Sequence, residues 1–400
     1  MPCLAPAVPC ATFDTGEPMR QQLNPNVRLT GTGACLPERV VDNLELGELV
    51  SGYDASHSGP FHHWVDQVTH VHERRFAAPE VRSSDMAVVA ARQALEAAGI
   101  EASDLGMVVY ASFTLSQILP GDHCRLVEEL GAPTVPTFQL MAACAGSIYG
   151  LGVAYSMVAA GVYEHVLVIG AETIAHTLNF ADPITSIIFG DGAGAAVVSR
   201  YRSSDGDGRG MLPPDLSGEF SPRAIHLSNS NVPIEMPVFP DRALQPGVPL
   251  VAQALIEMEA GPSVLRRAVV HMAGRTARCL GYDPRDLKRG DEGLRTSLDS
   301  AWIVPHQANG RIIDGLVDKL KIAPERAIRT IYRYGNISAA SNLIALDHGI
   351  RYGNTRRVLD DDGHVTAIET QPEHKIREGD LVLMPSIGGG YLMGCVGFVL

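Results

Sequence analysis

The sequence predicts an α/β protein made of two similar halves. Segments with helical and strand patterns alternate along most of the chain, and the second half repeats the order of the first. Alternation of this kind is typical of helices layered on sheets. Of the 400 residues, 46% are hydrophobic, which is sufficient for two ordinary domains or one large duplicated domain.

The first half contains helices and buried strands in alternation. Residues 83–100 have helical apolar spacing and end at a glycine, and residues 104–113 follow as a buried strand. An apolar helix rich in small residues is predicted within 139–161, followed by a strand at 165–172. The glycines of 187–199 then predict a turn that leads into another strand.

The second half has the same order. Residues 261–282 predict a helix, and residues 299–309 predict a strand that runs into a loop. Two helices are predicted at 311–322 and 338–350, and residues 380–400 predict two strands around a glycine turn. The matching order of helix, strand, glycine-rich turn and strand makes two similar halves the economical explanation.

Two segments interrupt the alternation of helices and strands, and the first residues of the chain lie outside it. The proline-rich stretch 203–250 is interpreted as a loop or cap between the halves, and residues 352–378 as an inserted hairpin that turns at Asp362-Gly363. The start of the chain lacks the basic and apolar regions of a signal peptide, so we interpret it as a disordered leader. The predicted divisions are therefore a leader at 1–27, a first half at 28–202, the 203–250 loop and a second half at 251–400.

Charge and cysteine content narrow the class of protein. A net charge of −13 argues against a nucleic-acid partner, which requires a basic surface. The seven cysteines are odd in number and form no CxxC pair, which favours reduced thiols in the cytoplasm. No segment has the composition of a membrane span. Five histidines lie between His57 and His72, but no cysteine or repeated spacing completes a ligand set, so we expect no metal.

Three residues are candidates for chemistry. Cys144 lies at the predicted start of a helix, where unpaired backbone N–H groups and the helix dipole favour a thiolate and can stabilise an oxyanion. Taken alone, a buried cysteine is more often a small hydrophobic core residue. His306 follows a predicted strand and Asn336 lies in a glycine-led turn, and each alone is more often a structural polar group. Together, the three residues predict one site at the strand ends.

A set of motifs runs from Arg28 to Leu400. In chain order they read "GTGACLPERVVDN", "ERRFAAP", "AACAG", "IIFGDGAGAAVV", "VPHQANGRII", "GNISAAS" and "IGGGY". In content and order this set resembles one family, the β-ketoacyl-ACP synthase III branch of the thiolase-fold condensing enzymes. The resemblance implies a thiolase-like fold in which two αβα halves form a five-layered αβαβα core. It also implies a homodimer that uses thioesters of CoA or phosphopantetheine as substrates and requires no cofactor.

The resemblance assigns roles to individual residues. Cys144 matches the acylated nucleophile, and His306 and Asn336 match the pair that binds the carbonyl of the extender thioester. The oxyanion hole is expected from the backbone N–H groups of Cys144 and Gly389. Asparagine has no basic site, which fits stabilisation of an enolate better than proton abstraction.

The resemblance also places the substrate-binding surfaces. Trp64 and Arg311 match positions that contact CoA or the carrier arm at the tunnel mouth, and Leu119 falls near an acyl pocket limited by the partner subunit. The family often has an arginine four residues after the tryptophan, where this chain has Val68. The stretch 179–192 is shorter than its usual counterpart and lacks another arginine. These departures predict a specialised paralogue, for example in secondary metabolism.

The expected reaction loads an acyl group on Cys144 from acyl-CoA or acyl-carrier protein. Decarboxylative Claisen condensation with a malonyl-type thioester then gives a 3-oxoacyl thioester, in fatty-acid or polyketide metabolism. Two alternatives use the same thiolate: acyl transfer to a hydroxyl or amine, and the joining of two acyl chains. A papain-like protease uses the same residue order, but its local cysteine pattern is absent. A thiolase would need a second cysteine or a base, and a non-enzymatic subunit would be expected to lack the nucleophile.

Overall fold

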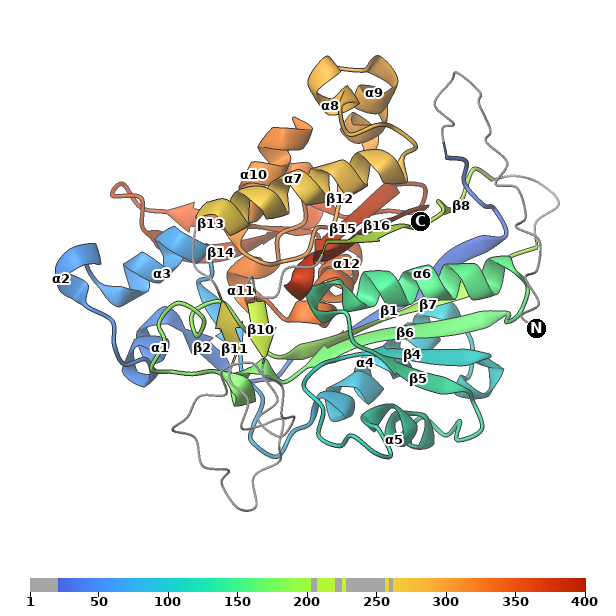
Figure 1. The fold of residues 1–400 in the computed structure, drawn as a ribbon, viewed down its shortest axis with the longest axis horizontal. Helices are drawn as coiled ribbons and strands as arrows, with labels where there is room; N and C mark the ends of the chain where they lie inside the picture. The colour runs from blue at the N-terminus through green and yellow to red at the C-terminus, as the bar shows by residue number, and fades with distance from the viewer. Residues whose placement is uncertain (1–20, 203–206, 220–224, 228–255, 259–261) are drawn as a thin grey trace, which may run out of the picture.

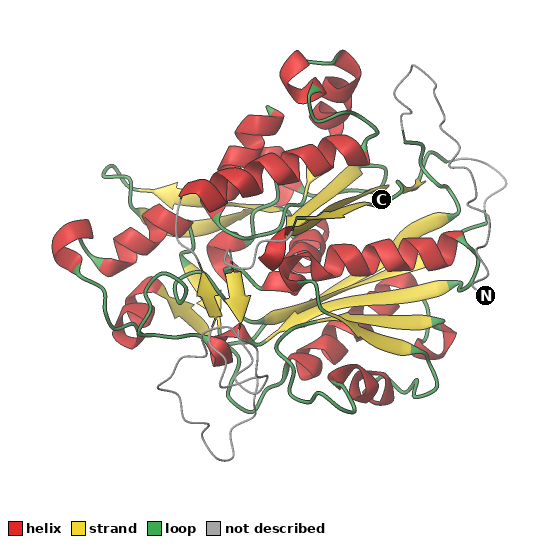
Figure 2. Cartoon of the chain, in the orientation of Figure 1, coloured by secondary structure: helices red, strands yellow, loops and turns green. Residues whose placement is uncertain are grey.

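The computed structural model describes residues 21–202, 207–219, 225–227, 256–258 and 262–400. Layers of helix, sheet, helix, sheet and helix follow one another in Figure 1, from α7 and α10 through α6 and α12 to α4 and α5. This αβαβα arrangement confirms the predicted fold class. Figure 2 shows the two sheets enclosing the central helices.

The first sheet comes entirely from the first half of the chain. Its strand order is β1-β7-β6-β4-β5, with β1 and β5 at the two edges. The β1/β7 and β7/β6 pairs are antiparallel, whereas β6/β4 and β4/β5 are parallel. The bounds are β1 (Val27–Cys35), β4 (Met107–Ala111), β5 (Thr137–Leu140), β6 (His165–Glu172) and β7 (Gly192–Arg200).

The second sheet has the order β12-β15-β16-β8, with β9 also paired to β16. The pairing of β12 with β15 is parallel and the other pairings are antiparallel. Only two residues of the strand predicted within 299–309 form β12, although the N–H groups of Val304 and His306 still donate to the Leu383 and Pro385 carbonyls of β15. The bounds are β8 (Gly210–Met211), β9 (Asp215–Gly218), β12 (Trp302–Ile303), β15 (Leu381–Ile387) and β16 (Leu392–Val399).

The strands β8 and β9 correct the interpretation of 203–250 as a loop between the halves. Both pair with β16 and so belong to the second sheet. Pro213 and Pro214 lie between the two strands, where they break the pairing and give the stretch the composition of a loop. Residues 228–255 lie outside the described part of the chain. A further pair of strands joins β10 (Ile225–Leu227) to β11 (Ile256–Met258).

Helices cover the sheets on the outside and separate them in the middle. Apolar side chains of α6 and α12 pack between the two sheets, where Ile148, Leu151, Leu343 and Leu346 are fully buried. The helix bounds are α4 (Ser83–Ala98), α5 (Asp122–Glu129), α6 (Gly146–Ala159), α7 (Pro262–Cys279), α10 (Gly310–Leu320) and α12 (Ser341–Arg351). Among the described residues, no helix combines the length and apolar character that crossing a membrane needs.

Small residues allow α4 to pack directly on the backbone of β1. A Cβ atom at Gly33 would lie 2.2 Å from the carbonyl oxygen of Ala90, and one at Gly31 would lie equally close to that of Ala94. The helix ends at Gly99, which adopts the left-handed conformation with φ of 67°. The "GTG" motif of β1 and the alanines of α4 are therefore complementary parts of one contact.

One end of the molecule carries a cap and the inserted hairpin. The hairpin pairs β13 (Asn354–Leu359) with β14 (Val365–Gln371), and its turn includes Gly363 with φ of 82°. In the cap, the fully buried Arg74 donates hydrogen bonds to Asn43 Oδ1 and to the carbonyl oxygen of Ile187. The cap consists of β2 (Val40–Asp42), α1 (Asn43–Leu49), α2 (Ala55–Ser58), α3 (Phe61–Thr69) and β3 (Glu73–Arg75). The remaining helices are α8 (Asp286–Arg289), α9 (Glu292–Ser300) and α11 (Ile331–Tyr334).

Candidate active site

Cys144 lies in a short 3-10 turn, η2 (Ala143–Ala145), directly before α6. Ala143 has a positive φ of 46°, a strained conformation for a residue with a Cβ atom. The second sheet holds this turn, since the Ser386 hydroxyl donates to the carbonyl oxygen of Cys144 at 3.0 Å. The cysteine is therefore placed at the junction of both halves and is only 6% exposed.

Burial favours the neutral form of the Cys144 thiol and raises its pKa to about 11. The Ser338 hydroxyl, 3.4 Å from Sγ, and the backbone N–H of Gly389 act in the opposite direction, whereas Glu172 raises the pKa further. The thiolate expected at the helix start stays a prediction, which the removal of water from the sulfur opposes.

His306 follows β12 and is held against β15. Its backbone N–H donates to the Pro385 carbonyl at 2.9 Å, and its side chain is buried. Burial lowers the pKa of His306 to about 3, so the imidazole is neutral at pH 7. Its Nδ1 atom has no hydrogen-bond partner among the described residues. A neutral imidazole of this kind can donate one hydrogen bond and accept another.

Asn336 is fixed by its backbone and by its own side-chain oxygen. Its N–H donates to Ile188 O at 2.9 Å, and its carbonyl accepts from Gly190 N at 3.1 Å. The side-chain Oδ1 accepts from the backbone N–H of Ser338 at 2.8 Å. Because Oδ1 is engaged, the amide presents Nδ2 as a donor, and this atom has no hydrogen bond to any described residue.

A short chain of contacts links the three predicted residues. Ser338 donates through its backbone to Asn336 and through its hydroxyl to Cys144. Asn342 of α12 donates to Val304 O at 2.9 Å and to Pro385 O at 3.4 Å, so it ties the strand end before His306 to β15. The next residue of β15, Ser386, is the one that holds the Cys144 carbonyl. The structure therefore links the side chains of Cys144 and Asn336 through Ser338, and it ties the backbone at His306 to the strand that holds the Cys144 carbonyl.

The glycine turn after β15 lies against the cysteine. A Cβ atom at Gly388 would be 2.9 Å from the backbone nitrogens of both Cys144 and Ala145. Gly390 has a φ of 71°, which favours glycine. This close approach places the Gly389 N–H beside Sγ, where it lowers the pKa of the thiol. The position agrees with the donor role expected for Gly389, which remains a prediction.

Sequence reasoning missed two residues of the site, Ser338 and Glu172. Ser338 is part of "GNISAAS" and has a positive φ of 42°, so its position is specified by the turn after Asn336. Glu172 is a single acid at the end of the apolar strand β6, and it is fully buried. That isolated acidic residue in "HVLVIGAE" is the signal that could have identified it.

We expect Ser338→Ala to raise the pKa of Cys144 further. The variant loses the hydroxyl donor to Sγ, and a hydrogen bond to a charged group contributes about 1.5 kcal/mol. Alkylation by iodoacetamide at pH 8 should therefore be about tenfold slower than in the wild type. The control is Ser147→Ala, since this buried hydroxyl in α6 has no partner among the described residues. Equal rates in the Ser338 and Ser147 variants would contradict the assigned contact.

Glu172 is a buried carboxyl group that holds the loop after β4. It accepts from the Thr114 hydroxyl at 2.6 Å, the Thr114 N–H at 3.1 Å and the Ser112 hydroxyl at 3.2 Å. Burial raises its pKa from 4.5 to about 8, although these hydrogen bonds act to lower it. The native state therefore keeps a proton on Glu172 at pH 7, where the unfolded chain would have lost it.

This shift predicts a pH-dependent stability that Glu172→Gln removes. A pKa raised in the native state stabilises the fold fully below pH 4.5, and the contribution is lost as pH rises to about 8. Between these limits, the wild type should lose about 1 kcal/mol of unfolding free energy per pH unit relative to Glu172→Gln. Urea unfolding of both proteins from pH 5 to 8 measures the difference. Burial also raises the pKa of Asp191, to about 7, so its contribution to stability changes with pH in the same direction. Both proteins contain Asp191, so this contribution cancels when they are compared. Parallel pH profiles for the two proteins would show that Glu172 is ionised in the native state.

The residues expected at the tunnel mouth come from two neighbouring helices. Trp64 of α3 is half-buried, with its ring centroid 4.8 Å from that of Tyr53. Arg311 is exposed in the first turn of α10. Asn309, which caps α10, donates to the Val68 carbonyl near the end of α3 at 3.0 Å, so the two helices lie side by side.

Leu119 lies on the surface of the single chain, with 84% of its area exposed. Ile118 and Met141 are also exposed, at 57% and 64%. The acyl-pocket role of Leu119 depends on a partner subunit and stays a prediction.

The expectation of no metal also stays a prediction. His63 in the cap stacks on His364 of the hairpin, with ring centroids 3.8 Å apart. Candidate ligand atoms of Asp360, Asp362 and His364 lie within 4.8 Å of one another, but these side chains are exposed or half-exposed. The hairpin brings His364 beside the cap histidines, which lie far from it in the sequence.

Comparisons with known proteins show the family of the chain. The family model of 3-oxoacyl-[acyl-carrier-protein] synthase III matches residues 138–213, and that of its C-terminal part matches residues 292–359. The β-ketoacyl-[acyl-carrier-protein] synthase III of Thioalkalivibrio sulfidiphilus is 31% identical over 374 residues, which cover 92% of this chain and 97% of the relative. That of Rhizorhabdus wittichii is 33% identical and covers 91% and 96%.

Solved structures give the same result. The 3-oxoacyl-[acyl-carrier-protein] synthase III of Aquifex aeolicus superposes with a TM-score of 0.72 at 30% identity, covering 94% of this chain and all of the other. The priming β-ketosynthase of the R1128 polyketide pathway superposes with a TM-score of 0.71 at 29% identity, covering 96% and 97%. The chain therefore belongs to the β-ketoacyl-[acyl-carrier-protein] synthase III family.

Proposed function

We propose that this protein joins an acyl group to a malonyl-type thioester by decarboxylative condensation and releases a 3-oxoacyl thioester. The observation that carries this proposal is the buried linkage of Cys144, Ser338 and Asn336, with the neutral His306 held on the adjoining strand. It offers a nucleophile together with two uncharged donors. The names of the relatives, synthase III enzymes and a priming ketosynthase, support the same reaction class.

In the first half-reaction, Cys144 is acylated. The sulfur attacks the carbonyl carbon of an acyl thioester, so that a new S–C bond forms and the bond to the donor's sulfur breaks. The proton of Cys144 passes to the donor thiolate, which leaves as a thiol, and the neutral His306 is proposed to relay it. The N–H groups of Cys144 and Gly389 are proposed to donate to the oxyanion of the tetrahedral intermediate.

In the second half-reaction, the malonyl-type thioester loses carbon dioxide. The electron pair of the broken C–C bond passes into the thioester as an enolate, whose oxygen accepts hydrogen bonds from His306 and from Asn336 Nδ2. The enolate carbon then attacks the acyl carbonyl, and the Cys144 sulfur leaves and regains a proton. A pKa of about 3 keeps His306 neutral, which supports a hydrogen-bond donor without the positive charge of an imidazolium.

The substrates and the assembly are part of the proposal. Trp64 and Arg311, on adjoining helices, would contact CoA or an acyl-carrier protein, and no cofactor would be required because thioesters arrive activated. A homodimer is supported by β5, an edge strand of the first sheet that is followed directly by the exposed Met141. Leu119 would then contact the acyl pocket of the partner. A cytoplasmic location and a role in secondary metabolism complete the proposal.

The test is incubation of the purified protein with a panel of acyl-CoAs, followed by malonyl-acyl-carrier protein labelled in the carboxyl group. Intact-protein mass spectrometry after the first step identifies the acyl group on the enzyme. Release of labelled carbon dioxide, together with a 3-oxoacyl product, supports condensation. Acyl transfer to a hydroxyl or amine without carbon dioxide release would overturn it in favour of the acyltransferase alternative.

A further inference from the structure

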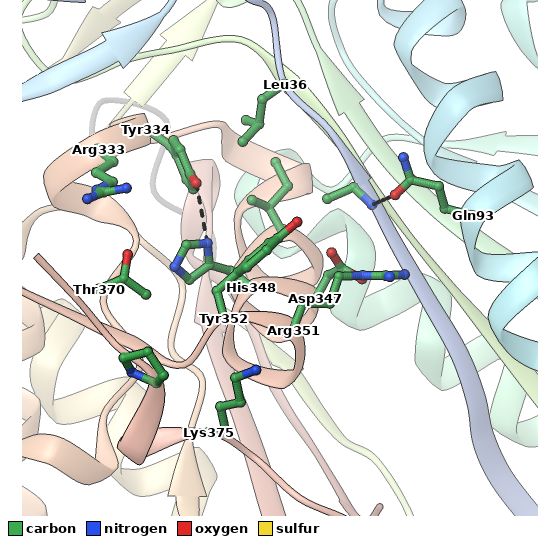
Figure 3. A pocket seen from close by; sticks show the side chains of 13 residues that line it. Leu36, Gln93, Arg333, Tyr334, Asp347, His348, Arg351, Tyr352, Thr370 and Lys375 are labelled. Atoms are coloured by element: carbon green, nitrogen blue, oxygen red, sulfur yellow. Dashed lines mark hydrogen bonds and ion pairs between the residues drawn. The ribbon is translucent and has the colours of Figure 1, made fainter.

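A second pocket lies between α12, β1 and the segment that follows the inserted hairpin, outside the Cys144 site. Its volume is about 700 Å³, within the range of small-molecule sites. Ala34 and Leu36 line it from the β1 side, and Thr370, Pro372 and Lys375 line it from the hairpin side. The inserted segment 352–378 therefore forms part of the wall (Figure 3).

Three aromatic rings line this pocket, with Tyr334 and His348 largely buried and Tyr352 exposed over 55% of its surface. The ring centroids of Tyr334 and His348 are 5.7 Å apart, and those of His348 and Tyr352 are 5.2 Å apart. Leu36 and Ile344 add aliphatic surface beside them. The lining thus suits a ligand with a flat or apolar body.

The charge of the pocket is positive, although the whole chain carries −13. Three cations line it, Arg333, Arg351 and Lys375, against the single acid Asp347. Asp347 is already engaged, since Arg351 Nε donates to its Oδ1 at 2.8 Å. The positive charges of Arg333 and Lys375 are therefore not balanced by an ion pair with a described residue. Figure 3 shows these two side chains on different sides of the aromatic rings.

Two buried nitrogen atoms in the pocket wall have no hydrogen-bond partner among the described residues. They are Nε2 of His348 and Nε of Arg333. His348 is only 5% exposed, and its other ring nitrogen lies 3.3 Å from the Tyr334 hydroxyl. When that hydroxyl donates to Nδ1, Nε2 carries the hydrogen. Both unpartnered atoms are then donors, and a buried donor without an acceptor destabilises the pocket.

From this combination we propose that the pocket binds a small organic anion, with one carboxylate or phosphate group on an aromatic or apolar body. The anionic group lies against Lys375 and accepts from His348 Nε2, and the body packs on Tyr334, His348 and Tyr352, while Arg333 adds positive charge from the other side of the rings. Burial, and secondarily Arg333, lower the pKa of His348 to about 4, so the ring contributes a hydrogen bond rather than a charge.

The position of the pocket links the ligand to the segment that carries Asn336. Tyr334 and Ile344, two residues of the wall, belong to one hydrophobic cluster with Ile337. Ile337 lies between Asn336 and Ser338, whose contacts orient the amide and the thiol. A ligand that packs on Tyr334 thus acts on the backbone of this segment. The effect of this ligand on catalysis rests on the proposed function, whereas the binding of the ligand to the pocket does not.

The test measures binding to the full-length protein without substrates, by calorimetry with phenyl phosphate, phenylacetate and inorganic phosphate. We expect saturable binding of at least one aromatic anion, and the tighter of the two identifies the anionic group. Inorganic phosphate should bind at least about tenfold more weakly, because it lacks the body that contacts the rings. Hydrogen exchange of residues 333–340 should slow in the presence of the tighter ligand.

Lys375→Glu provides the decisive variant, since it reverses a charge on a half-buried side chain that makes no ion pair with a described residue. Its affinity for the aromatic anion should fall by at least about tenfold. The matched control is Lys288→Glu on α8, an exposed lysine outside the pocket, which should bind like the wild type. No saturable binding of either aromatic anion, or equal affinity in the two variants, would overturn the proposal while leaving the condensation reaction untouched.

Discussion

Cys144→Ala is expected to carry no acyl group after exposure to acyl-CoA and to lose condensation activity by at least about a thousandfold. The sulfur is the atom that forms the covalent intermediate in the proposed reaction. Of the other cysteines in the described part of the chain, Cys124 is exposed, Cys35 is half-buried, and Cys279 and Cys395 are buried. None of them has the contact with Ser338 that places Cys144 beside Asn336.

Intact-protein mass spectrometry of wild type and variant measures the loss directly. The matched control is Cys124→Ala, which removes an exposed thiol and should load the acyl group at the wild-type rate. Thermal unfolding separates loss of chemistry from loss of fold, since removing one sulfur from a buried site leaves a small cavity. An acyl mass that persists in Cys144→Ala would refute the assigned nucleophile.

The order of the main elements could be predicted from the sequence because their signals are local. The spacing of apolar residues in 83–100 and the glycine at its end give α4 (Ser83–Ala98), and the run 165–172 is identical to β6. The strands β8 and β9 could not be predicted in this way. Each has at most four residues, Pro213-Pro214 separates them, and both are stabilised by pairing with β16, far away in the sequence.

The candidate site, like the fold, could be predicted where the signal is local in the sequence. It could not be predicted where it depends on contacts between distant segments. Motifs predicted Cys144, His306 and Asn336, and the structure links the side chains of Cys144 and Asn336 through Ser338. The ionisation of the thiol could not be predicted from the helix start alone, because the burial of the sulfur, which raises the pKa of the thiol, is not visible in a sequence. Glu172 acts on Cys144 from the end of another strand, and such proximity depends on the packing of β4, β6 and the cysteine turn.

Asn336→Asp is expected to stop the second half-reaction while leaving the first largely intact. One carboxylate oxygen can still accept from the Ser338 N–H, which now binds Oδ1 at 2.8 Å. The other oxygen replaces the Nδ2 donor with an acceptor that carries negative charge, and this charge opposes the enolate. Loss of one such donor lowers rates by about a hundredfold to a thousandfold, so carbon dioxide release should fall by at least this factor.

The acyl-loading rate of the same variant serves as an internal control. A carboxylate near Cys144 should also raise the pKa of the thiol, so loading should slow, but by much less than decarboxylation. The ratio of the two rates, measured by mass spectrometry and by labelled carbon dioxide, is therefore the quantity to compare with the wild type. If both rates fell by the same factor, Asn336 would be acting on the cysteine alone. The enolate would then be stabilised by His306 and by donors other than this amide.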